Sequence, residues 1–95
     1  MEQIWQLTAG NAPLVATAIH DGHQLRAEVA EIMALTDAAQ LREEDPFTGQ
    51  WTTVATHRLV GTHSRFEVDL NRPREKAVYL QPEDAWGLHV WRETP

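Results

Sequence analysis

The sequence of 95 residues contains no cysteine, which excludes disulfide bonds and thiolate metal sites. It also contains no apolar run near the roughly 20 residues that a membrane-spanning helix needs. The N-terminus, MEQIWQLTAG, lacks the basic and apolar regions of a secretory signal. These absences predict a cytoplasmic protein with no membrane partner.

Positive charge is scarce, because 8 lysines and arginines stand against 14 aspartates and glutamates, for a net charge of −6. Proteins that bind a nucleic-acid backbone carry an excess of cations, so nucleic acid is not an expected partner. Four basic residues nevertheless lie close together, namely Arg65, Arg72, Arg74 and Lys76. This cluster suits a small anionic ligand, and a solvated charged turn is the alternative.

Hydrophobic patterning predicts an α/β fold in which helices flank a mixed sheet. A nearly continuous apolar run at residues 13–19 indicates a buried strand, and β-branched residues at 52–61 indicate another. Residues 66–70 alternate between apolar and acidic side chains, which predicts a third strand with one face toward solvent.

Helices are expected between and after these strands. Apolar residues recur at helical spacing over residues 25–35, and Thr36 or Asp37 caps a further turn that ends near Leu41. Pro82, followed by two acidic residues, begins another helix. In α/β sheets of this kind, ligands bind beyond the carboxyl ends of the strands.

Polar residues follow the first predicted strand in the sequence HDGH. His20 and His23 lie three positions apart, and neutral imidazoles are the commonest protein ligands of zinc. The glycine between them lets the loop turn tightly. Glu44 and Asp45 are candidates for a carboxylate ligand or for a partner that hydrogen-bonds to a ligand. Two surface histidines in a polar loop are the alternative.

A second polar group, DLNR, ends the predicted strand over residues 66–70. The guanidinium of Arg72 suits a carboxylate, which it binds through two parallel hydrogen bonds, and the Asn71 amide adds a donor. Asp69 is placed to hold Arg72 or a metal-bound histidine. Arg65 offers a second cation to the substrate or to a developing oxyanion. These residues predict a carboxylate clamp beside a metal, with a salt-bridged strand end as the alternative.

Three segments resemble the N-terminal part of N-formylglutamate amidohydrolases: PLVATAIHDGH, LREEDPFTGQWT and SRFEVDLNRPREKAVYLQPEDAWGLHVW. The resemblance covers roughly residues 12–91, and the block SRFEVDLNRPREKAVY is its most specific part. DLNR is also similar to the motif of zinc carboxypeptidases and of the acylamino-acid deacylases related to them. The resemblance implies a phosphorylase/hydrolase-like α/β fold of the zinc exopeptidase kind.

In those relatives, an H-x-x-E pair supplies two zinc ligands and an Asn-Arg pair holds the carboxylate of the substrate. The resemblance therefore implies His20 as the first zinc ligand, with His23 at the position of the glutamate. It implies Asn71 and Arg72 as the substrate-binding pair, and Arg65 as the catalytic arginine beside the oxyanion.

The reaction implied by the resemblance is zinc-dependent hydrolysis of an N-formyl or N-acyl amide of an acidic amino acid. For N-formylglutamate, the products are formate and glutamate, in a late step of histidine degradation. Such enzymes are much longer, so residues 1–95 are expected to form a single, partial domain. The alternatives are a non-catalytic module that binds metal or a small carboxylate and self-associates as a homo-oligomer, and a purely structural α/β domain.

Overall fold

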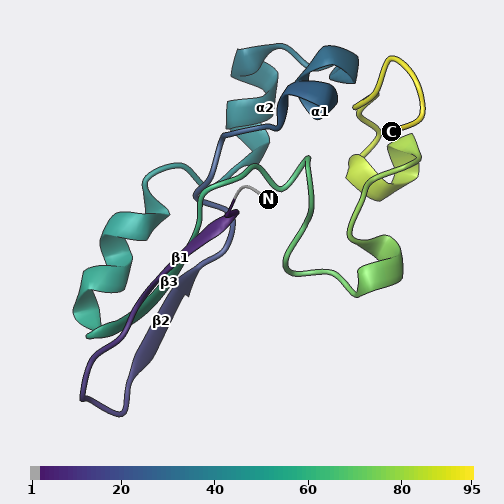
Figure 1. Ribbon diagram of the computed structural model, residues 1–95. Coiled ribbons are helices and arrows are strands. Elements are labelled where there is room, and N and C mark those ends of the chain that lie inside the picture. Colours follow the sequence, from purple (N-terminus) through teal and green to yellow (C-terminus); the bar gives the residue numbers. More distant parts are fainter. Residues whose placement is uncertain (1–2) are drawn as a thin grey trace.

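A computed structural model describes residues 3–95 and contains a three-stranded mixed sheet with short helices (Figure 1). β1 (Trp5–Thr8) pairs antiparallel with β3 (His57–Gly61), and β2 (Val15–Ala18) pairs parallel with β3. The strand order β1-β3-β2 places β1 and β2 at the two edges. The predicted α/β class with a mixed sheet is confirmed.

The helices are α1 (Ala27–Ile32), α2 (Asp37–Glu43) and the 3-10 helices η1 (Thr48–Val54), η2 (Arg74–Lys76) and η3 (Pro82–Ala85). Thr36 caps α2 as predicted, because its side-chain oxygen accepts a hydrogen bond from the Ala39 N–H at 3.1 Å. The helix predicted from Pro82 is η3, and none of the helices within residues 3–95 is long and apolar enough to cross a bilayer.

The strand predicted over residues 66–70 is wrong, because the chain forms turns there. The N–H groups of Glu67 and Val68 both donate to the Ser64 carbonyl, at 3.0 and 3.4 Å, as in a turn of helix. The alternating pattern implied that Glu67 and Asp69 face solvent, but both are buried. The carboxylate of Glu67 accepts a hydrogen bond from the Arg26 N–H at 2.6 Å and lies 2.8 Å from His63 Nδ1, and the hydrogen bonds of Asp69 are described below; these partners make burial of both carboxylates possible.

Two other strands differ from the prediction in extent or position. The segment 52–61 begins within η1, and only its second half forms β3. The apolar run at 13–19 does form β2, but at a sheet edge, where Val15 is 59% exposed. Apolar character therefore indicated a strand correctly without indicating how deeply it is buried.

The apolar core lies beyond the sheet, and its buried members are Met33, Phe66, Tyr79, Ala85 and Val90. The sheet extends away from this core as a narrow ribbon, in a molecule of 45 × 25 × 23 Å (Figure 1). The carboxyl ends of β2 and β3 lie where the sheet meets the core-forming segments.

Candidate functional site

The histidine loop and the DLNR segment meet at the carboxyl ends of β2 and β3. Beyond the strands, Gln24 joins the histidine loop to the segment after β3 through its backbone: its N–H donates to the Thr62 carbonyl at 3.3 Å, and its carbonyl accepts from the Ser64 N–H at 2.8 Å. As a result, His20 Nε2 lies 2.7 Å from Asp69 Oδ1. The structure thus brings together two residues that the sequence separates widely.

Gly22 makes this close approach possible. A Cβ atom at residue 22 would lie 2.3 Å from the carbonyl carbon of Thr62 and 2.5 Å from the carbonyl oxygen of His63. Both atoms belong to the backbone, so they cannot rotate away as a flexible side chain would. The glycine of HDGH therefore serves packing between the loop and the segment after β3.

The carboxylate of Asp69 is buried and lies at the centre of the site. Its Oδ1 accepts hydrogen bonds from His20 and, at 2.8 Å, from the Asn71 N–H. Its Oδ2 accepts hydrogen bonds from the Tyr79 hydroxyl and, at 3.3 Å, from Arg65 Nη2. Burial raises the pKa of this carboxyl, but the hydrogen bonds from Tyr79, His20 and Asn71 outweigh burial and lower the pKa to about 2.

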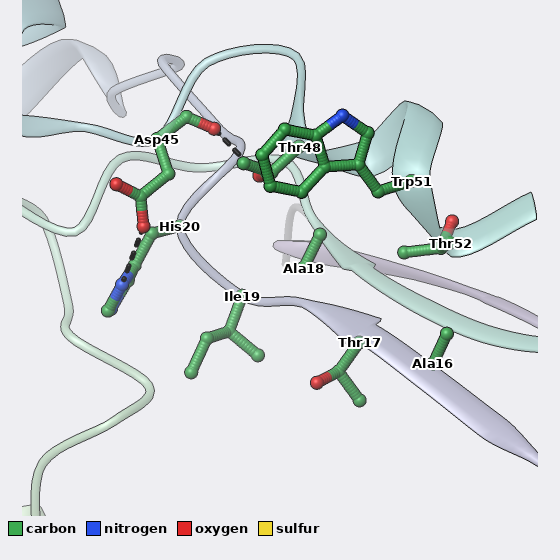
Figure 2. Close-up of a pocket in the computed structure, with 9 residues that line it drawn as sticks. All are labelled: Ala16, Thr17, Ala18, Ile19, His20, Asp45, Thr48, Trp51 and Thr52. Carbon is green, nitrogen blue, oxygen red and sulfur yellow. Dashed lines mark hydrogen bonds and ion pairs between the residues drawn. The ribbon is translucent and has the colours of Figure 1, made fainter.

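This ionised carboxylate determines how His20 presents its ring. Because Asp69 only accepts, His20 Nε2 carries the hydrogen and Nδ1 of the neutral ring presents a lone pair. Nδ1 lies 3.6 Å from Asp45 Oδ2, which is too long for a hydrogen bond (Figure 2). Two ligand atoms on one tetrahedral zinc ion lie about 3.3–3.5 Å from each other. His20 and Asp45 therefore fit two positions of a metal site, with Asp69 orienting the histidine.

His23 lies in a different environment. Its Nδ1 is 2.5 Å from Glu44 Oε1 and its Nε2 is 2.6 Å from Asp37 Oδ1. The hydrogen bond with Glu44 outweighs partial burial and, with that of Asp37, raises the pKa of His23. Within residues 3–95, no three histidine, aspartate or glutamate side chains form a group that could hold a metal. The metal-binding role of His23 stays a prediction, with both ring nitrogens facing carboxylates.

Glu44 is more deeply buried than its position in an acidic segment suggested. Besides His23, it accepts hydrogen bonds from the Gln40 amide at 2.9 Å and from the Ser64 hydroxyl. It therefore joins the end of α2 to the histidine loop and to the segment after β3.

Arg65 is directed into the protein. Its Nε donates to the Tyr79 hydroxyl at 3.1 Å, its Nη1 donates to the Glu43 carbonyl at 3.1 Å, and its guanidinium lies 5.0 Å from the Trp86 ring centre. Burial lowers its pKa, but Tyr79 and Asp69 outweigh burial and the net shift is upward. The predicted contact with an oxyanion would therefore require an N–H group of Arg65 that does not already donate to a partner within the protein.

Arg72 and Asn71 are more accessible. Arg72 lies over the Tyr79 ring, 5.1 Å from its centre, and its Nε is 3.9 Å from Asp69 Oδ2. Its side chain is 32% exposed, and Asn71 is exposed beside it. Both groups therefore reach solvent next to Asp69, as a clamp for a substrate carboxylate requires.

Sequence reasoning did not identify Tyr79, whose hydroxyl contacts both Asp69 and Arg65. Its burial and its hydrogen bond to Asp69 raise its pKa to about 12, so it stays a protonated donor at neutral pH. The signal in the sequence was a tyrosine within the apolar run AVYL, because a buried tyrosine hydroxyl needs a polar partner.

A pocket of about 290 Å³ opens beside His20, between β2 and η1 (Figure 2). His20 and Asp45 line it together with small and apolar side chains, among them Ala16, Ile19 and Trp51. The indole of Trp51 forms one wall, and the residue is 74% exposed. His20 and Asp45 lie together at one end of the pocket (Figure 2).

Comparison with known proteins gives one result. The family model of N-formylglutamate amidohydrolase matches residues 12–94. A search of curated proteins and a search of solved structures found no match. The matched range contains all the site residues described above.

Proposed function

Because the chain belongs to the N-formylglutamate amidohydrolase family, we propose that it acts in zinc-dependent hydrolysis of the amide in N-formylglutamate or a related N-acyl acidic amino acid. The observation that carries this proposal is the 2.7 Å contact between His20 and Asp69, which joins a candidate metal ligand to the candidate carboxylate clamp. The products would be formate and glutamate, in a late cytoplasmic step of histidine degradation.

Each residue has a role in this proposal. The fork of Arg72 and the amide of Asn71 bind the substrate carboxylate, which fixes the position of the scissile amide. His20 and Asp45 would hold the zinc ion, which when bound supplies a water that is acidic enough to act at neutral pH. An N–H of Arg65 that does not already donate within the protein would face the carbonyl oxygen of the scissile amide.

A binding module without catalysis is the second candidate. Catalytic zinc sites use three protein ligands, whereas two donors, His20 and Asp45, converge among residues 3–95. This observation favours a protein that captures a small carboxylate or a metal without hydrolysing an amide. Binding and formate release must therefore be measured separately.

The clamp is tested by calorimetric titration of N-formyl-L-glutamate, together with measurement of formate release with and without Zn²⁺. Arg72→Ala should weaken binding by about 10- to 100-fold, because it removes two charge-assisted hydrogen bonds. Arg72→Lys should restore it only in part, because the ammonium lacks the planar fork. His20→Ala should lower the affinity for Zn²⁺.

Arg74→Ala is the matched control, since Arg74 is an exposed arginine two positions further along the chain. Normal binding by Arg72→Ala together with weak binding by Arg74→Ala would mean that the clamp is assigned to the wrong arginine. Binding without formate release would favour the module, and absence of both would reject both candidates.

A further inference from the structure

We propose that Tyr79 is a positioning residue of the carboxylate clamp: its ring holds the guanidinium of Arg72 through a cation–π contact, which leaves the N–H groups of Arg72 available to the substrate. The inference rests on the proposed function, since it assumes that Arg72 binds the substrate carboxylate. It concerns how the protein fixes this arginine before the substrate binds.

The two arginines of the site are held in different ways. Arg65 donates hydrogen bonds to protein partners from all three of its side-chain nitrogens. Arg72, in contrast, makes one side-chain hydrogen bond with residues 3–95, from Nη2 to the Asp84 carbonyl at 3.4 Å. Its Nε lies 3.9 Å from Asp69 Oδ2, which is too long for a hydrogen bond. Hydrogen bonds therefore fix Arg65, whereas most N–H groups of Arg72 remain for a ligand.

The strongest contact that remains for Arg72 is with the Tyr79 ring. Its Cζ atom lies over this ring, 5.1 Å from the ring centre. The π electrons of the ring attract the cation, and this attraction needs no hydrogen-bond acceptor. A carboxylate binds a guanidinium through two parallel N–H groups, which have to be available. Holding Arg72 by a ring therefore suits a clamp better than holding it by a second carboxylate would.

Tyr79 is itself fixed, so it offers a rigid support. It is 1% exposed, and its ring packs nearly perpendicular to the rings of Phe66 and Trp86, at centre-to-centre distances of 5.7 and 6.0 Å. Its hydroxyl donates to Asp69. Because the ring is held by two neighbouring rings and by its hydroxyl, the Arg72 side chain that lies over it is restricted as well.

The ring and the hydroxyl of Tyr79 should have separable effects. A side chain that is 32% exposed, as that of Arg72 is, would sample several rotamers without the ring, and ordering it would weaken ligand binding about two- to tenfold. The hydroxyl instead contacts Asp69 and Arg65. Affinity for the substrate carboxylate should therefore depend on the ring, and stability on both parts.

Two variants separate these parts. Tyr79→Phe and Tyr79→Leu both lose the hydrogen bonds of the hydroxyl, but only phenylalanine keeps a ring. In calorimetric titration with N-formyl-L-glutamate, Tyr79→Phe should bind nearly as tightly as the wild-type protein, and Tyr79→Leu about two- to tenfold more weakly. Urea unfolding should show that both variants are less stable, so a merely structural role would weaken binding in both. In the Arg72→Ala background, the two variants should bind equally, because the ring then has no cation to position.

A spectroscopic measurement does not depend on how well a leucine fills the core. The ring current of Tyr79 should shift the side-chain proton resonances of Arg72 upfield from those of Arg74, an exposed arginine two positions further along. The shift should persist in Tyr79→Phe. If Tyr79→Leu does not fold, these resonances decide the question.

The outcomes separate the inference from the proposed function. Equal affinities of the phenylalanine and leucine variants, or a difference that persists without Arg72, overturn the positioning role and leave the proposed function in place. Arg72 resonances that coincide with those of Arg74 also overturn it. Absence of binding by the wild-type protein rejects the proposed function, and the positioning role with it.

Discussion

At Asp69, one buried carboxylate contacts groups from three parts of the chain: the loop after β2, the turns after β3 and the segment before η3. A buried charge is stable only when other groups supply what water would have supplied. Here a ring N–H, a backbone N–H, a hydroxyl and a guanidinium do so. Asp69 therefore has two roles: it stabilises the fold, and it orients the His20 ring.

Replacing Asp69 with asparagine should destabilise the protein at pH 7 by about 3–5 kcal/mol, because the partly buried guanidinium of Arg65 loses its charged partner. The destabilisation caused by this substitution should be smaller in acid. The folded-state pKa of Asp69, about 2, lies below the ordinary value of 3.8, so its contribution is complete above pH 4 and is lost as pH falls toward 2. Urea unfolding of both proteins at pH 5 and pH 2 should show the difference narrowing by about 2 kcal/mol. A difference that is constant with pH would contradict this assignment.

The sequence indicated several site residues but not how they are arranged. The motif DLNR implied that Asp69 holds an arginine or a histidine, and the structure places its carboxylate against both His20 and Arg65. Nothing in the spacing indicated that Tyr79 and Trp86 enclose Arg65. Such contacts depend on the tertiary packing of distant segments, which periodicity does not encode.

At the scale of elements, the segment 66–70 shows why alternation alone does not define a strand. A strand needs a neighbour for its backbone hydrogen bonds. Here the N–H groups of Glu67 and Val68 instead donate to the Ser64 carbonyl. The side chain of Asp69 turns inward to His20 and Arg65. The helix that begins after Thr36 was predicted correctly because its capping signal is local in the sequence.

Helix α2 is attached to the histidine loop at both of its ends. His23 contacts Asp37, the first residue of α2, and Glu44, the residue after its last turn. These contacts raise the pKa of His23 above its ordinary value of 6.5, so the stabilisation is complete below pH 6.5 and is lost as pH rises through the raised value. Amide hydrogen exchange in α2, corrected for intrinsic rates, should therefore show protection that decreases between pH 6 and pH 9.

The variant His23→Gln should remove this dependence on pH, since glutamine does not titrate. His89→Gln, a change at an exposed histidine, serves as the control and should keep it. Protection of α2 that is the same at both pH values in the wild-type protein would show that the imidazole does not stabilise the helix.

At the scale of the whole molecule, one face of the sheet lacks a covering element among residues 3–95. Register places Trp5, Leu7, Val15 and Leu59 on that face, whereas Val60 on the other face lies against Gly49 of η1. Leu7 is 61% exposed and Val15 nearly as much. Both edge strands also present backbone groups that a further strand is able to pair with. We therefore expect this apolar face to serve as an interface.

We expect the protein to self-associate through this face at micromolar concentration. The double variant Leu7→Lys and Val15→Lys places two charges on the face and should shift the population toward monomer. Gln6→Lys adds a charge to the opposite face of the same strand and should not. Sedimentation velocity over a concentration series measures this distribution. A wild-type protein that sediments as a single chain at every concentration would contradict the expectation.

The contact between His20 and Asp69 joins residues that lie 49 positions apart. Bringing together the ends of a loop costs chain entropy that grows with the logarithm of its length, and only the contacts at its closure return that free energy. The loop contains α1, α2, η1 and β3. A ligand that bridges His20 and Arg72 would bind only the form in which this loop is closed. Its binding free energy would therefore stabilise the closed loop, and loop closure would in turn favour binding.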